Sequence, residues 1–135
     1  MATVAHGRRR SRMQWALGAL ALAPTLSGIQ LILRGADGAP GESPRVSSTI
    51  DGELRYANVF KTAGGAVILS QLGVVEDSPV LTAALGTIFV GGLARLLSWK
   101  QAGRPHGVAI GATALEVGVV PVILLWRRRV ASGRA

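Results

Sequence analysis

Four long apolar stretches, separated by short polar segments, dominate the hydrophobic pattern of this chain. They cover residues 13–33, 54–75, 80–97 and 108–126. A membrane-spanning helix needs about 20 mostly apolar residues, and all four stretches come close to that length. The second stretch is the most polar, because Arg55, Asn58 and Lys61 lie in its first part, which must enter the membrane or its rim. The pattern predicts an all-α protein, an integral membrane four-helix bundle.

The polar segments between the stretches have the composition of turns and coil. The first is rich in Gly, Pro and Ser. The second is the tight turn EDSP, in which Asp77 or Ser78 is expected to cap the third helix. The expected organisation is a basic cytoplasmic tail at 1–12, a four-span membrane domain at 13–127 and a second basic cytoplasmic tail at 128–135.

The first apolar stretch has an alternative interpretation, because a basic start followed by apolar residues is also typical of a secretory signal. The small residues Ala19, Ala21 and Ala23 offer a poor cleavage site. The apolar run nevertheless continues to Leu33, and Pro24 follows the small residues directly. We therefore expect an uncleaved first helix, with a removed signal as the alternative.

Lysine and arginine are unevenly divided between the two sides of the predicted bundle. One side carries eight, which are Arg8, Arg9, Arg10, Arg12, Arg127, Arg128, Arg129 and Arg134. The other side carries four, which are Arg34, Arg45, Lys100 and Arg104. Cytoplasmic loops carry the excess of positive charge, so we expect a multi-pass protein of the bacterial inner membrane with both termini in the cytoplasm. Trp15, Trp99 and Trp126 lie near span ends, where indole rings favour the interface.

The composition agrees with a membrane protein and argues against several soluble functions. Hydrophobic residues make up 49% of the chain and charged residues only 16%, whereas a soluble domain carries about 25% charged residues. The net charge of +8 would suit nucleic acid, but the aromatic content is 4% and the arginines lie at the ends of apolar runs. The chain has no cysteine, and His6 and His106 have no partner at metal-ligand spacing. We expect no nucleic-acid partner, no metal and no cofactor.

Five charged residues are expected in the outer half of the bundle. They are Glu53, Arg55, Lys61, Arg95 and Glu116. An isolated charge at the bilayer centre costs roughly 2.5–3.5 kcal/mol, so we expect these charges to converge and pair, with Asn58 on the same helix face as Arg55. They are either structural ion pairs that fix helix register, or the lining of a polar cavity for a small anionic or amphipathic ligand. Proton or ion coupling is a third interpretation.

Small residues accompany the charges on their helix faces, and such residues let membrane helices approach closely. We expect Gly64, Gly65 and Gly91 to serve this packing rather than to hold a phosphate. The lipid bilayer is the expected surrounding of the remaining Leu, Ile and Val surfaces, which leaves room for a homo-oligomer or a partner within a membrane complex.

Two segments, DGELRYANVFKTAGGAVIL and GGLARLLSWKQAGRPHGVAIGATALEVGVVPVILL, resemble the small bacterial membrane proteins grouped as domain of unknown function 4345. The resemblance covers roughly residues 13–127. It rests on the order and spacing of Glu53, Arg55, Tyr56, Gly64, Gly65, Arg95, Gly103, Pro105 and Glu116. It implies a compact four-helix membrane bundle, broadly similar to the DoxX-like group, with Gly103 and Pro105 in a turn. It supplies no activity, and Lys61 departs from the pattern, which has an apolar or aromatic residue there.

Three functional hypotheses follow. The favoured one is a non-enzymatic protein that binds a partner or ligand, because the sequence has no nucleophile–base pair, metal set or phosphate loop. The second is a small proton-coupled exporter, working as a dimer, with Glu116 as its membrane carboxylate. The third is an enzyme acting on a lipid or quinone, in which Arg55 and Arg95 hold an oxygen and Glu116 acts as acid or base.

Overall fold

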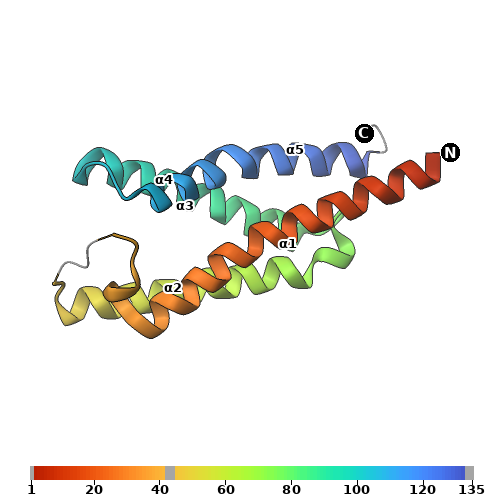
Figure 1. Ribbon diagram of the computed structural model, residues 1–135. Helices are drawn as coiled ribbons and strands as arrows, with labels where there is room; N and C mark the ends of the chain where they lie inside the picture. The colour runs from red at the N-terminus through yellow and green to blue at the C-terminus, as the bar shows by residue number, and fades with distance from the viewer. Residues whose placement is uncertain (1, 42–44, 133–135) are drawn as a thin grey trace.

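The computed structural model describes residues 2–41 and 45–132, without the side chains of residues 2–6, 8 and 9, and all regular structure in this part of the chain is helical. The elements are α1 (Ala2–Arg34), η1 (Gly35–Gly38), α2 (Ser48–Ser70), η2 (Leu72–Val74), α3 (Pro79–Ala102), α4 (Gly107–Ala114), η3 (Leu115–Val119) and α5 (Val120–Ala131). Because α4, η3 and α5 continue without a break, the chain forms four long helices (Figure 1). The predicted all-α class is confirmed.

Three of the four long helices are long and apolar enough to cross a membrane. They are Arg10–Gly38, Pro79–Ala102 and Gly107–Ala131. Most of their surface points outward, and large apolar side chains such as Leu26, Val90 and Val122 are more than half exposed. Soluble proteins rarely expose apolar surface on this scale, which indicates a membrane protein. The fourth helix, α2, is not among the three, since charged residues occupy its first half.

The helix boundaries follow from local sequence. Ser47 and Ser78 cap α2 and α3, because their hydroxyl groups accept hydrogen bonds from the N–H groups of Ile50 and Leu81. At the other end of α3, Gly103 has a φ of +93°, a conformation that glycine adopts without strain. The two segments expected as basic tails are largely helical, because α1 begins at Ala2 and α5 ends at Ala131, whereas residues 1 and 133–135 lie outside the described part.

The four helices form two hairpins. Helix α1 pairs with α2, and α3 pairs with the helix formed by α4, η3 and α5 (Figure 1). We call one end of the molecule the termini end; it holds the start of α1, the last turn of α5 and the turn between α2 and α3. The opposite end, with η1 and the turn between α3 and α4, is the distal end. The two hairpins diverge toward the distal end (Figure 1).

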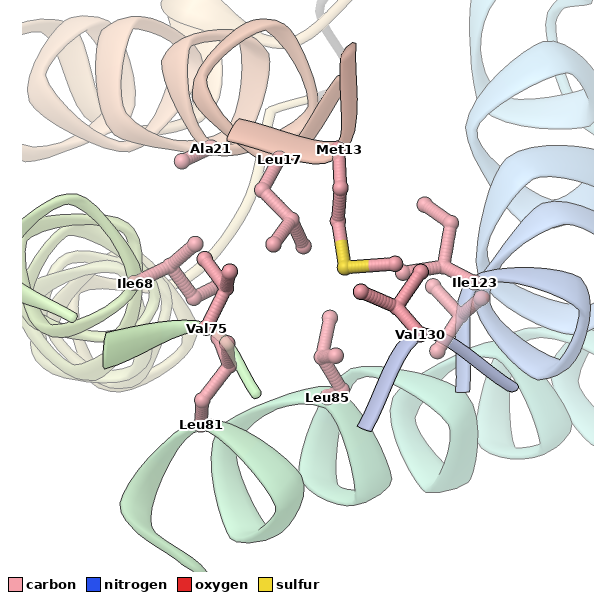
Figure 2. Packing of buried hydrophobic residues seen from close by; sticks show 10 residues of the cluster. Met13, Leu17, Ala21, Ile68, Val75, Leu81, Leu85, Ile123 and Val130 are labelled. Atoms are coloured by element: carbon pink, nitrogen blue, oxygen red, sulfur yellow. The ribbon is translucent and has the colours of Figure 1, made fainter. Parts of the chain in front are cut away.

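The buried hydrophobic core occupies the termini end. Figure 2 shows side chains from all four long helices and the α2–α3 turn meeting there. The core consists of Met13, Leu17, Ala21, Ile68, Val75, Leu81, Leu85, Val120, Ile123 and Val130. The apolar stretches did not predict this asymmetry, because the first, third and fourth are largely apolar along their whole length. None of these core residues belongs to the distal half of α2 or of α3.

One turn of the last helix is π-helical. In η3 the N–H of Val120 bonds to the carbonyl of Leu115, five residues earlier. The following residue, Pro121, has no N–H to offer the preceding turn, and this loss is a known cause of irregular helical hydrogen bonding. Single π-helical turns are frequent at functional sites. Here the turn carries Glu116, the one charged residue of η3.

Candidate functional site

The clearest interhelical charge contact of the distal half joins Arg95 of α3 to Glu116 of η3. The Nε atom of Arg95 lies 3.0 Å from the Oε2 atom of Glu116, and the side chains are 40% and 20% exposed. The two helices approach closely at this level: a Cβ atom on Gly92 would lie 2.7 Å from Cγ2 of Val117 and 2.8 Å from Cβ of Glu116. Glycine at position 92 thus allows the approach that brings the carboxylate to the guanidinium.

A third charge lies near this pair. Lys61 of α2 is half-buried, and its ammonium group interacts electrostatically with both Arg95 and Glu116. The cluster therefore holds two cations and one carboxylate, contributed by three helices. We call Lys61, Arg95 and Glu116 the charged cluster. Its net charge is positive.

Arg95 also lines a small pocket of about 110 Å³ between the end of α3 and the start of α4. The lining residues are Arg95, Ser98, Trp99, Gly103, Pro105, Ala109 and Thr113. We call this space the Arg95 pocket. Gly103 and Pro105, expected only to form a turn, line this space, and Glu116 does not. The side chain of Arg95 thus contacts a carboxylate through its Nε atom and also lines the pocket.

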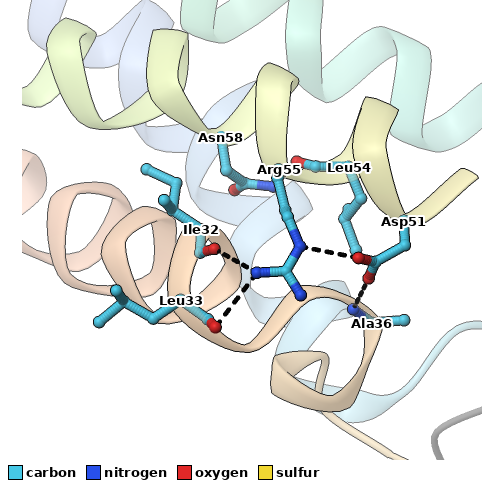
Figure 3. Close-up of polar contacts among 7 residues, drawn as sticks. All are labelled: Ile32, Leu33, Ala36, Asp51, Leu54, Arg55 and Asn58. Carbon is cyan, nitrogen blue, oxygen red and sulfur yellow. Dashed lines mark hydrogen bonds and ion pairs between the residues drawn. The ribbon is translucent and has the colours of Figure 1, made fainter. Parts of the chain in front are cut away.

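Arg55, which the sequence placed in the same cluster, lies elsewhere (Figure 3). Its Nη1 atom donates to the carbonyl oxygens of Ile32, at 2.7 Å, and Leu33, at 3.1 Å, in the last turn of α1. Its Nε atom donates to Oδ2 of Asp51 at 2.7 Å. Carbonyl groups at a helix C-terminus lack intrahelical partners and carry negative partial charge. Arg55 therefore caps α1 and does not join Arg95.

Asp51 was not among the expected site residues, yet it completes the cap. Its Oδ1 atom accepts a hydrogen bond of 2.9 Å from the N–H of Ala36, which begins the chain reversal after α1 (Figure 3). The hydrogen bond from the Arg55 guanidinium, aided by that from Ala36, lowers the pKa of the Asp51 carboxyl from its usual value. The spacing of four residues between Asp51 and Arg55, which allows an ion pair on one helix face, was visible in the sequence. Asp51 was not considered as a site residue because it precedes the predicted span.

Of the other two expected cluster residues of α2, Asn58 is buried and Glu53 is exposed. Asn58 donates to the carbonyl of Leu54 at 2.7 Å, within its own helix. The face of α2 that carries Asn58 and Gly65 packs on α1 and not on α3 or α4, because a Cβ on Gly65 would collide with Oγ1 of Thr25.

Two glycines expected to mediate helix packing face open space. A Cβ atom on Gly64 or Gly91 would meet nothing within 4 Å. Their neighbours Gly65 and Gly92 make the close approaches instead. The double glycines were visible in the sequence, but which member of each pair faces a helix depends on helix rotation, and periodicity alone did not fix that rotation.

Sequence reasoning missed a polar clamp at the termini end. Arg127 is only 5% exposed; it donates to the carbonyl oxygens of Val75, at 2.6 Å, and Ser78, at 3.0 Å, and to Oγ1 of Thr82, at 2.8 Å. A signal was available, because Val120, Ile123, Arg127 and Val130 recur at helical spacing and form the buried face of α5. Arg127 had been assigned to topology alone.

Helix α1 holds the same turn from the other side. The Nη2 atom of Arg10 donates to the carbonyl of Gly73 at 2.5 Å, and its Nε atom lies 3.3 Å from Oε1 of Glu76. Gln14 donates to the carbonyl of Leu72 at 2.8 Å. We call Arg10, Gln14 and Arg127 the turn clamp. It ties the turn between α2 and α3 to both the first and the last helix.

No metal centre emerges from the described residues, among which no three His, Asp or Glu side chains are grouped as metal ligands would be. Among the side chains that line the Arg95 pocket, Arg95, Ser98 and Trp99 carry polar groups that could contact a small molecule, whereas the hydroxyl of Thr113 donates to the carbonyl of Ala109 at 2.9 Å.

Comparison with known proteins gives one finding. Neither the curated proteins nor the solved structures include a match to this chain. A family model described as a domain of unknown function, DUF4345, matches residues 12–127, which contain the charged cluster, the Arg95 pocket and Arg127 of the turn clamp. The chain belongs to the DUF4345 family.

Proposed function

We propose that this protein is a four-span protein of the bacterial inner membrane, with both termini in the cytoplasm, that binds a small anionic or amphipathic ligand at Arg95 and catalyses no reaction on it. One observation carries the proposal. The side chain of Arg95 contacts Glu116 through its Nε atom and also lines the Arg95 pocket. A cation fixed in place beside a pocket is a typical element of a binding site.

The fourth span in this proposal is α2, despite its polar beginning. Polar groups are tolerated in a membrane when they find partners within the protein. Arg55 and Asn58 meet this condition through backbone carbonyl groups, and Thr62 donates to the carbonyl of Asn58 at 2.9 Å. The apolar second half of α2 then crosses the rest of the bilayer. The excess of Lys and Arg at the termini end supports a cytoplasmic position for that end.

The size of the Arg95 pocket argues against an enzyme of quinones. Pockets for drug-sized ligands measure roughly 300–1,000 Å³, whereas this one has about 110 Å³. A quinone ring would not be enclosed by it. Nor does the pocket bring a nucleophile to a base, because its hydroxyl groups belong to Ser98 and Thr113 and its described lining contains no histidine or carboxylate.

A small proton-coupled transporter is the second candidate. Glu116 favours it, because this carboxylate lies in the π-helical turn of a proposed span. The variant Glu116→Gln separates the two functions. Under the binding proposal it lowers thermal stability in detergent and leaves proton-dependent efflux in cells unchanged. Loss of efflux by a variant that still inserts and folds would favour the transporter.

The orientation can be tested by single-cysteine labelling, since the chain has no cysteine of its own. We expect an impermeant maleimide added outside the inner membrane to label Ser48→Cys and Gln101→Cys at the distal end. Asp77→Cys and Ser132→Cys, at the termini end, should react only after the membrane is permeabilised. All four positions are exposed. Equal labelling of Ser48→Cys and Asp77→Cys would show that α2 does not cross.

Ligand binding can be tested by native mass spectrometry of the protein purified in a mild detergent. We expect the wild-type chain to retain a small molecule that Arg95→Gln loses. Arg104→Gln is the matched control, because Arg104 is exposed at the same end and does not line the pocket. Equal retention by both variants would remove Arg95 from the site.

A further inference from the structure

We propose that the ligand of the Arg95 pocket carries a phosphate group. This inference rests on the proposed function, and it names the chemistry of the part that enters the pocket. Three observations lead to it: the donors that Arg95 has available, the charge of the cluster and the volume of the space.

The donors of Arg95 are largely free. A guanidinium group has five N–H donors in a rigid planar fork. In Arg95 the Nε atom faces Glu116, and the described residues provide no acceptor for the four N–H groups of the two terminal nitrogens. In Arg127, by contrast, all three nitrogens have protein acceptors. The fork of Arg95 is thus available for a ligand with two or more oxygens, and guanidinium and phosphate groups match in geometry.

The charged cluster favours an anion. Lys61 and Arg95 bring two positive charges, and Glu116 compensates one of them. An uncompensated charge in a low-dielectric region is costly, so a second anion near Arg95 gains both Coulomb energy and hydrogen bonds. Glu116 fixes the guanidinium without occupying the pocket, and that arrangement leaves the position for the second anion open.

The volume limits what can enter. The pocket measures about 110 Å³, well below the roughly 300–1,000 Å³ of pockets that enclose drug-sized ligands. A compact group such as a phosphate suits a space of this size. Trp99 and Pro105 supply an apolar wall, and Ser98 supplies a hydroxyl group. Any larger part of the ligand must lie outside, toward lipid or solvent.

The phosphate can belong to a lipid headgroup or to a soluble molecule. Titrations of the full chain in a nonionic detergent distinguish these sources, with short-chain phosphatidylglycerol and inorganic phosphate as probes and acetate as the anion without phosphorus. Tryptophan fluorescence reports binding, since Trp99 lines the pocket. We expect saturable binding of at least one phosphate probe and none of acetate. Arg95→Gln should weaken it at least about tenfold, as expected for loss of charge-assisted hydrogen bonds.

Two further variants sharpen the test. The affinity of Arg104→Gln for the phosphate probe should stay within about twofold of wild type. The loss expected in Arg95→Gln comes from hydrogen bonds inside the pocket, and Arg104 does not line the pocket. If Arg95→Gln fails to fold, Arg95→Lys replaces it; it keeps the charge but loses the planar fork, and should still bind more weakly than wild type. Binding of phosphatidylglycerol alone identifies a lipid headgroup, and binding of inorganic phosphate identifies a soluble phosphate.

The outcomes also separate this inference from the proposed function. If neither phosphate probe binds in an Arg95-dependent way, the inference is overturned. In that case, a phosphorus-free molecule that wild type retains and Arg95→Gln loses would preserve the proposed function. If the wild-type chain retains no Arg95-dependent molecule and binds no probe, both fail.

Discussion

The two ends of this molecule differ in the interactions that join their helices. At the termini end, ten buried apolar side chains from the four long helices and the α2–α3 turn form the core (Figure 2). The turn clamp ties the α2–α3 turn to the first and the last helix. At the distal end the two hairpins diverge, and polar side chains join the helices of each hairpin, Arg55 to the end of α1 and Arg95 to Glu116. The shared apolar core thus lies at the termini end, and polar side chains lie between the helices at the distal end.

Two arginines show what this difference means. Arg127 is 5% exposed, and its three nitrogens donate to three protein acceptors. Arg95 has a 40% exposed side chain, one carboxylate beside it and a pocket in front of it. A cation whose nitrogens all have protein acceptors stabilises a fold, whereas a cation with free donors can recognise a ligand. The same residue type is therefore held in different ways at the two ends, and only Arg95 keeps donors free for the proposed ligand.

The largest expected effect comes from removing the guanidinium at the termini end. Arg127→Met keeps an apolar stem but leaves the carbonyl groups of Val75 and Ser78 without their donor. Unsatisfied buried acceptors are costly, so we expect unfolding free energy to fall by about 2–4 kcal/mol. Equilibrium unfolding in mixed micelles measures it. Arg128→Met, at an exposed neighbour, should change stability by less than about 0.5 kcal/mol; equal effects would contradict a structural role specific to Arg127.

A smaller loss is expected from the contact between α1 and α2. In Gly65→Ala the new Cβ would collide with Oγ1 of Thr25 and lie 2.9 Å from the carbonyl oxygen of Ala21, which is helix backbone and cannot rotate away. The helices must separate, at a cost of about 1–3 kcal/mol. The control is Gly64→Ala, whose Cβ meets nothing within 4 Å. Thermal unfolding in detergent should rank the control at or above wild type, since alanine favours helix.

The distal end offers a matched pair of the same kind. Gly92→Ala places a Cβ 2.7 Å from Cγ2 of Val117 and 2.8 Å from Cβ of Glu116, whereas Gly91→Ala meets nothing within 4 Å. Because one of the contacted atoms ends a side chain, we expect about 1–2 kcal/mol, less than at Gly65. The shift of η3 should also move Glu116 from Arg95 and weaken ligand retention in native mass spectrometry. Unaltered retention would show that the pair does not position the guanidinium.

Much of the architecture could be predicted from the apolar stretches. Their length and separation gave the all-α class and the four helices, and the pattern of family positions gave DUF4345. The unequal ends could not be predicted, because the core depends on how the hairpins cross. Likewise the sequence indicated helix packing at the glycine pairs Gly64–Gly65 and Gly91–Gly92 but not which member of each pair faces the neighbouring helix, because helix rotation decides that.

The expected charge cluster illustrates the same limit. Helical spacing correctly placed Arg55 and Asn58 on one face of α2. Spacing does not show which neighbouring helix that face contacts, and in the structure it packs on α1. Arg55 therefore meets carbonyl groups of α1, while Arg95 meets Glu116. Arg127 was counted toward topology because a run of arginines after an apolar stretch fits that interpretation. Its helical spacing with Val120, Ile123 and Val130 could have indicated a buried position, but its acceptors lie in the turn at 71–78 and in α3, and spacing along one helix does not identify a partner in another element.

The smallest expected effect concerns the cap formed by Asp51 and Arg55, and it depends on pH. The Arg55 hydrogen bond lowers the pKa of Asp51 in the folded state, so the cap stabilises fully above the unfolded pKa of about 4 and is lost as pH falls through the lower folded value. Asp51→Asn keeps an acceptor for Ala36 but removes the charge. We expect its melting temperature to lie below wild type at pH 7, by less than in the variants above, and the gap to narrow as pH falls below about 4. Glu53→Gln, at an exposed carboxylate of the same helix, should show no gap at pH 7 or in acid. A gap for Asp51→Asn that does not narrow at all in acid would mean that the charge of Asp51 does not stabilise the cap.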